Sequence, residues 1–256
     1  MAMKLALYQG PPIGGDVEAG FARLGAQLGA AARAGASMAV FPELFLPGYN
    51  RPDLHRSLAQ PLGGAWTDRL AALAREAGCG LTVGWAEREG EVVYNAATCF
   101  GARGERLGHY RKIQLYGPME KASFSPGADY CLFDLDGVPA ALMICYDVEF
   151  APHVRALAER GVKLILVPTA NPEGFDFVSR VFVPARAAEM GLTIAYANFC
   201  GTEGELTFAG QSVIAGPDAS LFAAAGKGEA LLVAEIGISP DPRFLSTQLA
   251  DFRKVC

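Results

Sequence analysis

The 256-residue sequence lacks the cysteine and histidine patterns of a metal site. Its six cysteines are dispersed, C-x-x-C does not occur, and no cysteine–histidine pair has the spacing of zinc ligands. The three histidines, His55, His109 and His153, lie in no recognisable motif. We therefore expect no metal and no cofactor, and mostly reduced cysteines in the core.

Clusters of basic residues and long apolar runs are missing as well. The formal net charge is −5 and no four Lys or Arg residues cluster, so we expect no surface for nucleic acid or an anionic membrane. No stretch reaches the ~18 apolar residues of a membrane span, and the apolar stretch at the N-terminus is too short for a signal peptide. These absences predict a cytoplasmic protein with neither nucleic acid nor membrane as a partner.

Apolar residues, by contrast, are abundant: they make up 51% of the chain, against 19% charged residues. Strand-like and helix-like segments alternate without a linker, which predicts one domain over residues 1–256 with a C-terminal tail from about residue 240. The pattern predicts roughly ten strands and four or five helices in an α/β fold with mixed sheets. Within it we expect helix N-caps at Asp16 and Thr67, a hairpin turn at Asp136 and Gly137, and a helix kinked or split by Pro184.

Three reactive side chains come directly after strand-like runs. Glu43 follows "AVFP", Lys112 follows "GHYR", and Cys145 follows "ALMI". A thiol that attacks a carbonyl, a carboxylate that moves protons and a cation that stabilises an oxyanion are the parts that acyl transfer needs. The spacing by itself leaves open whether the three converge.

Each of these residues also has a purely structural interpretation. Cys145 is typical of a buried core thiol, Glu43 of a loop brace and Lys112 of an exposed strand end. Asp147 and Glu149 are typical of charges at the N-terminus of the helix that follows. No G-x-S-x-G elbow, P-loop or H-E-x-x-H motif offers a competing site.

Three ordered motifs favour the catalytic interpretation. The segments "VFPELFLPGY", "YRKIQLYGPMEKASFSPG" and "LMICYDVEFAPHVRAL" resemble the three motifs of the nitrilase superfamily of carbon–nitrogen hydrolases. The resemblance extends from residue 5 to about residue 240. It implies an αββα four-layer sandwich that forms a homodimer or a larger homo-oligomer, with the tail at the subunit interface. At "PARAAEM", Pro184 and Met190 depart from the family pattern, so we expect altered helix geometry there.

The resemblance also implies roles for single residues. The implied nucleophile, general base, oxyanion-stabilising cation and supporting second glutamate are Cys145, Glu43, Lys112 and Glu120. The backbone N–H of Tyr146 would complete the oxyanion hole. Positive potential from the lysine and from the start of the next helix is expected to lower the pKa of the thiol.

The chain resembles most the bacterial aliphatic amidases, and among them the 5-aminopentanamidases, in segments such as "ICYDVEF" and "ANFCGTEGELTFAGQS". This implies hydrolysis of a small amide, with an amine on its acyl chain, to carboxylate and ammonia through a cysteine thioester. Candidate substrate-binding residues are Tyr49, Asn50, Glu149, Glu173 and Asp176. N-carbamoyl amine amidohydrolases, ω-amidases and nitrilases use the same three catalytic residues and remain alternatives, as does a non-catalytic binding protein of the same fold.

Overall fold

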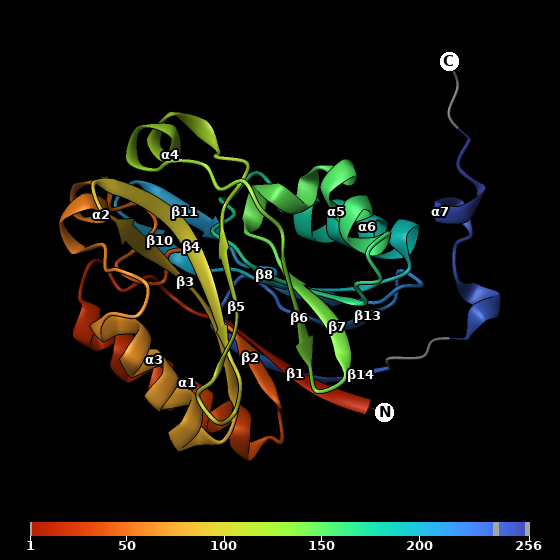
Figure 1. The fold of residues 1–256 in the computed structure, drawn as a ribbon, viewed down its shortest axis with the longest axis horizontal. Helices are drawn as coiled ribbons and strands as arrows, with labels where there is room; N and C mark the ends of the chain where they lie inside the picture. Colours follow the sequence, from red (N-terminus) through yellow and green to blue (C-terminus); the bar gives the residue numbers. More distant parts are fainter. Residues whose placement is uncertain (1, 238–240, 254–256) are drawn as a thin grey trace.

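The computed structural model describes residues 2–237 and 241–253 and contains two six-stranded sheets packed face to face (Figure 1). The first sheet contains, in spatial order, β14 (Ala230–Gly237), β1 (Ala2–Gln9), β2 (Met38–Val40), β3 (Gly80–Glu89), β4 (Val92–Phe100) and β5 (Arg106–Arg111). The second contains β13 (Leu221–Ala224), β12 (Val213–Ala215), β9 (Thr193–Ala197), β8 (Leu164–Pro168), β7 (Val138–Leu142) and β6 (Cys131–Leu135). A separate hairpin contains β10 (Cys200–Glu203) and β11 (Leu206–Ala209). Both large sheets are mixed, because parallel pairs at their centres are flanked by antiparallel pairs.

Helices cover the outer face of each sheet and complete four layers. α1 (Val17–Arg33) and α3 (Ala65–Ala77) cover the first sheet, and α5 (Ala151–Ala158) and α6 (Val183–Met190) cover the second. The shorter helical segments are α2 (Pro52–Leu58), α4 (Gly117–Ser123), α7 (Gln248–Asp251), the 3-10 helices η1 (Cys145–Glu149) and η3 (Pro242–Phe244), and the π-helix η2 (Val178–Phe182). Three hydrophobic cores lie between the four layers. The expected αββα sandwich is confirmed.

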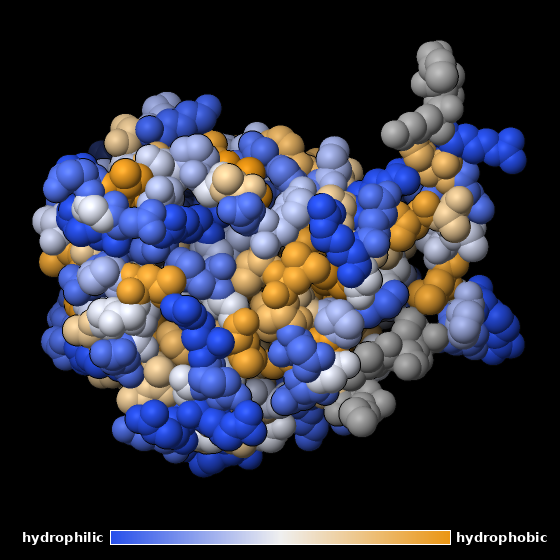
Figure 2. Space-filling model, viewed as in Figure 1, coloured by the Kyte–Doolittle hydropathy of each residue, from blue (hydrophilic) through white to orange (hydrophobic). Residues whose placement is uncertain are grey.

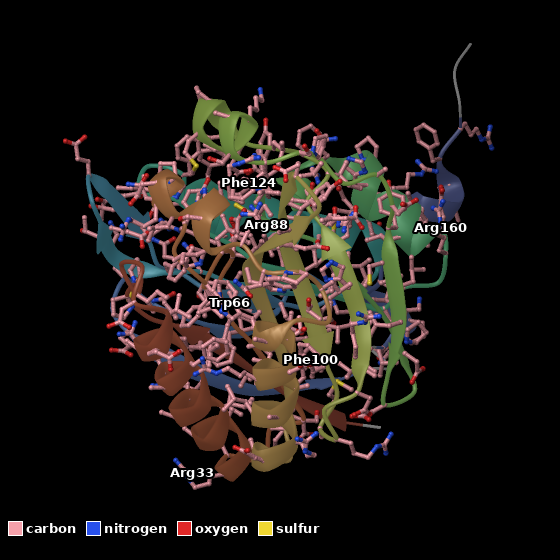
Figure 3. All side chains as sticks on the ribbon, turned by 60° about the vertical axis from the view of Figure 1, so that its left-hand side comes forward. Arg33, Trp66, Arg88, Phe100, Phe124 and Arg160 are labelled. Atoms are coloured by element: carbon pink, nitrogen blue, oxygen red, sulfur yellow. The ribbon has the colours of Figure 1, made fainter. Side chains whose placement is uncertain are left out.

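The central strands are apolar on both faces because a core lies on each side of them. In β1, Leu5 and Leu7 belong to the core between the two sheets, whereas Ala6 belongs to the outer core beneath α1 and α3. Trp66 from α3 and Phe100 from β4 pack in that same outer core (Figure 3). This double burial explains the apolar runs in the sequence, where a half-exposed strand would alternate with polar residues.

Two local predictions from turn and helix chemistry are confirmed. Asp136 and Gly137 join β6 to β7 with φ angles of 52° and 85°, and positive φ at both residues is the geometry of a type I′ hairpin turn. Pro184 is the second residue of α6, directly after the π-helical turn η2, so the proline separates two helical segments.

The N-cap predictions had different outcomes. The Asp16 carboxylate accepts a hydrogen bond from the Ala19 N–H at 3.0 Å and caps α1 as expected. The prediction for Thr67 was wrong, because α3 begins two residues earlier, at Ala65, after Gly64. The Thr67 hydroxyl instead donates to the Gly64 carbonyl oxygen at 2.8 Å, so it lies inside the first turn.

The C-terminal tail, described from residue 241 to residue 253, contacts the helical layer of the second sheet (Figure 1). The Arg155 guanidinium of α5 lies 4.3 Å from the centre of the Phe252 ring. Cys256 lies outside the described residues, and the other five cysteines are free thiols. Over one face of the molecule, polar and charged residues surround a central apolar area (Figure 2). Within the described ranges, no helix has the length and apolar character needed to cross a membrane.

Candidate active site

Three strand ends bring Glu43, Lys112 and Cys145 into one buried region. Glu43 lies in the turn three residues after β2, Lys112 directly follows β5, and Cys145 lies three residues after β7. The turn with Glu43 packs directly on β3, since a Cβ atom at Gly84 would lie 2.6 Å from the Glu43 Cα, so only glycine fits at this position. The Lys112 N–H donates to the Asn95 carbonyl oxygen of β4 at 2.8 Å. The sheet backbone therefore fixes the base and the cation.

The Lys112 ammonium group joins two carboxylates in the interior. Its Nζ atom lies 2.6 Å from Glu43 Oε1 and 2.7 Å from Glu120 Oε1, and all three side chains are fully buried. Asn95 Nδ2 donates to the same Glu43 oxygen at 2.7 Å. The other oxygen, Glu43 Oε2, is buried and has no hydrogen-bond partner among the described residues. Two carboxylates around one cation leave an excess negative charge, which favours the uptake of a proton.

Each oxygen of Glu120, which lies on α4, already accepts a hydrogen bond from the protein. Oε1 accepts from Lys112 and, at 2.7 Å, from the Tyr49 hydroxyl, while Oε2 accepts from the Tyr116 N–H at 2.9 Å. Glu120 therefore holds the lysine in place, whereas Glu43 has an oxygen free for chemistry. Tyr49, one of the candidate substrate-binding residues, is 5% exposed and belongs to this buried network.

Cys145 occupies a strained backbone position at the start of η1. Its φ angle is 45°, in the left-handed region that residues other than glycine rarely adopt. Asp147 stabilises this turn and is fully buried, so it is a brace and not an exposed helix charge. Its carboxylate accepts from the Tyr110 hydroxyl at 2.8 Å and from the Gln114 N–H at 2.7 Å. Because these two residues flank Lys112 in sequence, Asp147 couples the position of the nucleophile to that of the cation.

The Cys145 thiol carries its proton at rest. Burial raises the pKa of Cys145 and the Glu43 carboxylate raises it further, while Lys112, the Thr169 hydroxyl and the backbone of Ala170 act in the opposite direction. The lysine thus acts on the thiol pKa in the expected direction, but burial outweighs it. Attack by the sulfur requires a base that removes the proton.

Glu43 has the properties of that base. Burial raises the pKa of Glu43 to about 7, against the opposing charge of Lys112. Burial acts to lower the pKa of Lys112, but the carboxylates of Glu43 and Glu120 raise it well above its usual value, so the ammonium stays charged. A base with a pKa near neutral can both accept and return a proton at physiological pH.

Glu149 lies beside the catalytic residues in a partly buried position. In a 3-10 helix, residues three apart eclipse each other, so Tyr146 and Glu149 share one face of η1. The Tyr146 ring packs edge-on against the Tyr116 ring, with centroids 5.2 Å apart. Within the described part of the chain the Glu149 carboxylate forms no ion pair; burial raises its pKa, while the charges of Lys112 and Arg186 act in the opposite direction. This face therefore combines an unpaired acid with aromatic rings.

The other candidate substrate-binding residues, Asn50, Glu173 and Asp176, are engaged in contacts outside the catalytic network. Their partners are Glu203, Lys227 and Gln211, at 2.8, 2.6 and 2.5 Å respectively. The Asn50–Glu203 contact ties the first motif to β10, and the ion pair of Glu173 is exposed. Among the described residues, no hydrogen bond or ion pair joins these three side chains to Cys145, Glu43 or Lys112.

Asn95 and Thr169 are site residues that the sequence analysis missed. Asn95 is fully buried on β4 and donates a hydrogen bond to the base, Glu43. Thr169 directly follows β8, and its hydroxyl contacts the nucleophile, Cys145. The only signal for Asn95 was a polar residue within the apolar run "YNAATCF", which is typical of a buried hydrogen-bonding group.

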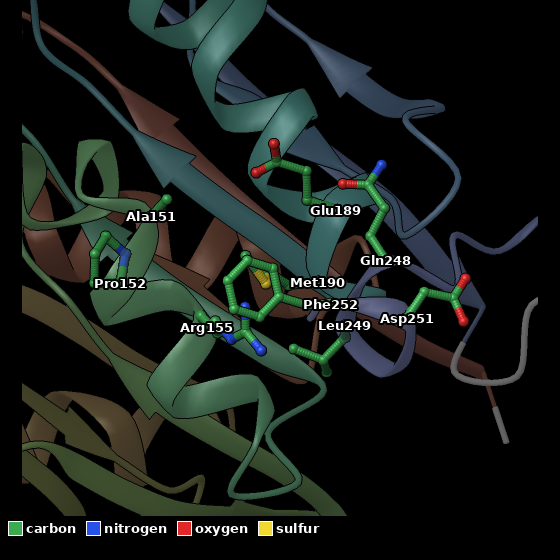
Figure 4. Close-up of a pocket in the computed structure, with 9 residues that line it drawn as sticks. All are labelled: Ala151, Pro152, Arg155, Glu189, Met190, Gln248, Leu249, Asp251 and Phe252. Carbon is green, nitrogen blue, oxygen red and sulfur yellow. The ribbon is translucent and has the colours of Figure 1, made fainter. Parts of the chain in front are cut away.

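A cavity of about 530 Å³ lies away from the catalytic residues, between α5, α6 and the tail (Figure 4). Arg155, Met190 and Phe252 are among its lining residues. Nowhere in residues 2–237 and 241–253 do three His, Cys, Asp or Glu side chains form a group able to hold a metal ion.

Comparison with known proteins decides the family. The carbon–nitrogen hydrolase family profile matches residues 4–239. The chain belongs to this family. A Pseudomonas protegens protein named "Hydrolase in pqqF 5′ region" is 41% identical over 98% of the chain and 89% of its own length. The (R)-stereoselective amidase of a Pseudomonas species is 32% identical over 78% of the chain and 72% of its own length.

Solved structures of the amidase from Nesterenkonia sp. AN1 share the whole carbon–nitrogen hydrolase fold. One, with acrylamide joined to the active-site cysteine by Michael addition, has a TM-score of 0.90 and 36% identity and covers 98% of this chain and 96% of the other. Another holds butyramide, with a TM-score of 0.87 and 34% identity, over 98% of this chain and 94% of the other. Cys145 aligns with the active-site cysteine, so the chain is an amidase of the nitrilase superfamily with an active-site cysteine.

Proposed function

We propose that this amidase hydrolyses a small aliphatic amide to a carboxylate and ammonia through a thioester on Cys145. The observation that carries the proposal is the unequal use of the two Glu43 oxygens. Lys112 and Asn95 hold Oε1, whereas Oε2 is buried and has no partner in the described part of the chain. A carboxylate fixed by one oxygen and free at the other is positioned to carry a proton between sulfur, amide nitrogen and water.

In the acylation step, Glu43 Oε2 takes the thiol proton while the Cys145 sulfur bonds to the amide carbon. The resulting oxyanion accepts hydrogen bonds from the Tyr146 N–H and from Lys112 Nζ. Tyr146 is the second residue of η1, where N–H groups have no partner within the helix, and Lys112 directs two of its three N–H groups to the carboxylates. The proton on Glu43 then passes to the amide nitrogen, the C–N bond breaks, and ammonia leaves.

The acyl chain of the substrate is short and carries an amine. Short amides are what the Nesterenkonia amidase holds, as acrylamide and butyramide show for that enzyme. On the face of η1 next to the nucleophile, an ammonium group would find the unpaired Glu149 carboxylate and the rings of Tyr116 and Tyr146. These features support a substrate of the 5-aminopentanamide type.

Ammonia release from four compounds tests the proposal, with the Cys145→Ala variant as the blank. The compounds are 5-aminopentanamide, pentanamide, an N-carbamoyl amine and a simple nitrile. We expect the aminated amide to react fastest. Activity on the carbamoyl compound or the nitrile alone would agree with the assigned catalytic residues. It would refute the proposal that the substrate is an amide. No release from any of them would favour a binding protein.

Glu149→Gln should reduce kcat/KM for 5-aminopentanamide by about 10- to 100-fold, because the amine loses a charged partner. The value for uncharged pentanamide should stay close to that of the wild type. Glu173→Gln is the matched control, since this acid lies in an exposed ion pair with Lys227. Equal loss on both amides in Glu149→Gln would show that the residue has a structural role only.

The rate should increase with pH up to about 7 and then level off. Glu43 acts as a base only when it is deprotonated, and burial raises its pKa to about 7, so protonation removes the base as the pH falls. Lys112 and Glu120 face the same carboxylate, and the ammonium stays charged across this range. The measurement is kcat/KM from about pH 5 to about pH 9. A profile that is flat across the neutral range would contradict this assignment of the base.

We also propose that the chain forms a homodimer through the helical layer of the second sheet. Phe177 and Val181 lie one turn apart on the helical stretch that leads into α6 and are 43% and 56% exposed, and neighbouring exposed apolar side chains are typical of an interaction surface. Sedimentation analysis measures the mass of the protein in solution. Twice the mass of one chain would support the homodimer, and the mass of a single chain would contradict it.

A further inference from the structure

Two buried oxygens, on active-site residues that are hydrogen bonded to each other, have no donor among the described residues. Glu43 Oε2 and Asn95 Oδ1 both lie inside the protein, and neither has a hydrogen-bond partner among the described residues. Their residues are fully buried and joined by the 2.7 Å hydrogen bond from Asn95 Nδ2 to Glu43 Oε1. Buried polar atoms are rarely left unpaired, so this pair of acceptors points to a ligand that donates two hydrogen bonds.

The orientation of the Asn95 amide follows from its neighbours. Glu43 Oε1 accepts from the Lys112 ammonium at 2.6 Å, which marks this oxygen as an acceptor. With the amide turned over, the Asn95 oxygen would face the carboxylate oxygen, and two acceptors would repel each other. The Asn95 backbone is fixed as well, because its carbonyl oxygen accepts from the Lys112 N–H at 2.8 Å. Oδ1 is therefore the free atom of a rigid side chain.

We propose that Glu43 Oε2 and Asn95 Oδ1 together bind the water molecule that hydrolyses the acyl-enzyme. Water supplies two donors, one for each oxygen, and keeps its lone pairs for attack. The inference rests on the proposed thioester mechanism and adds a positioning residue to it. Asn95 acts through the water, whereas Glu43 exchanges the proton.

The step balances without any further reactant. The water oxygen bonds to the thioester carbon while one of its protons moves to Glu43 Oε2, and Asn95 Oδ1 holds the second hydrogen. When the tetrahedral intermediate collapses, the C–S bond breaks and the proton on Glu43 passes to the Cys145 sulfur. The product leaves as a carboxylic acid and loses its proton to solvent. Asn95 is thus needed when water attacks, and the acylation step does not require Oδ1.

Asn95→Leu has a similar shape but removes both Oδ1 and the Nδ2 donor to Glu43, so the two half-reactions are measured separately. First-turnover ammonia release reports acylation, and the acyl-enzyme mass together with steady-state carboxylate formation reports deacylation. With hydroxylamine as an alternative nucleophile, the ratio of hydroxamate to carboxylate should increase by about 10- to 100-fold, and acyl-enzyme should accumulate. The control is Thr98→Val, because Thr98 is another buried polar residue of β4. This variant should leave the ratio of hydroxamate to carboxylate unchanged.

An unchanged ratio, with ammonia release and hydrolysis reduced equally, would overturn the inference and make Asn95 a brace of Glu43. In that case the thioester mechanism would stand. If wild-type protein released no ammonia and formed no acyl-enzyme, the proposed function would fail together with the inference. A crystal structure of Cys145→Ala provides a test that does not depend on folding of Asn95→Leu. A water within hydrogen-bond distance of both oxygens supports the inference, and its absence at high resolution overturns it.

Discussion

Replacing Cys145 with alanine should abolish amide hydrolysis and leave the fold intact. The sulfur forms the covalent bond to the acyl group, and loss of a nucleophile typically lowers kcat by about 10⁴- to 10⁶-fold. The buried side chain changes by a single atom, and alanine has the same backbone restrictions as cysteine at a φ of 45°, so the free energy of unfolding should change little. Ammonia release and urea denaturation measure the two quantities.

The matched control for this variant is Cys99→Ala. Cys99 is also a buried thiol of the core between the sheets, and burial raises its pKa, but Lys112 is not among the groups that act on that pKa. Its loss should create a small cavity and leave turnover unchanged. Intact amide hydrolysis in Cys145→Ala would refute the nucleophile assignment. Loss of activity in both variants would show that the effect comes from the core and not from the chemistry.

Much of the site could be predicted from the sequence because its reactive residues follow apolar strands. The runs before Glu43, Lys112 and Cys145 marked β2, β5 and β7, and strand ends are places where a rigid scaffold presents side chains. The three ordered motifs then identified the family. The hairpin at Asp136 and Gly137 was predictable for a similar reason, since positive φ angles at both turn residues restrict the residue types strongly.

The remaining features depend on contacts between distant segments. Asp147 is two residues from the nucleophile, yet its function as a brace comes from hydrogen bonds to residues 110 and 114, which no local pattern reveals. Asn95 reaches Glu43 across 52 positions of sequence. The direction of the thiol pKa shift was not predictable either, because burial of Cys145 is a property of the whole sandwich and exceeds the effect of one lysine. Local propensity also misplaced the cap of α3, where Thr67 lies inside the first turn.

Replacing Lys112 with methionine should reduce both activity and stability. The variant loses an oxyanion donor and the cation that fixes Glu43, so kcat should fall by at least about 10²- to 10³-fold. It also leaves the carboxylates of Glu43 and Glu120 buried without their cation, and removal of one partner from a buried ion pair typically costs about 3–5 kcal/mol of the free energy of unfolding. Urea denaturation and steady-state ammonia release measure these effects.

The pH dependence of the stability loss tests its electrostatic cause. In the wild type, burial already raises the pKa of Glu43 to about 7, although Lys112 acts to lower it. Without the lysine this folded-state pKa should rise further, so above about pH 7 the folded variant keeps a proton that the folded wild type and the unfolded chain have released. The stability gap between Lys112→Met and the wild type should therefore widen as the pH rises from about 7 to about 9. Glu43→Gln is the control, because it removes one negative charge, keeps Lys112 paired with Glu120, and should abolish activity with a smaller loss of stability. A gap that does not change with pH would show that Lys112 stabilises the fold by packing and not by its charge.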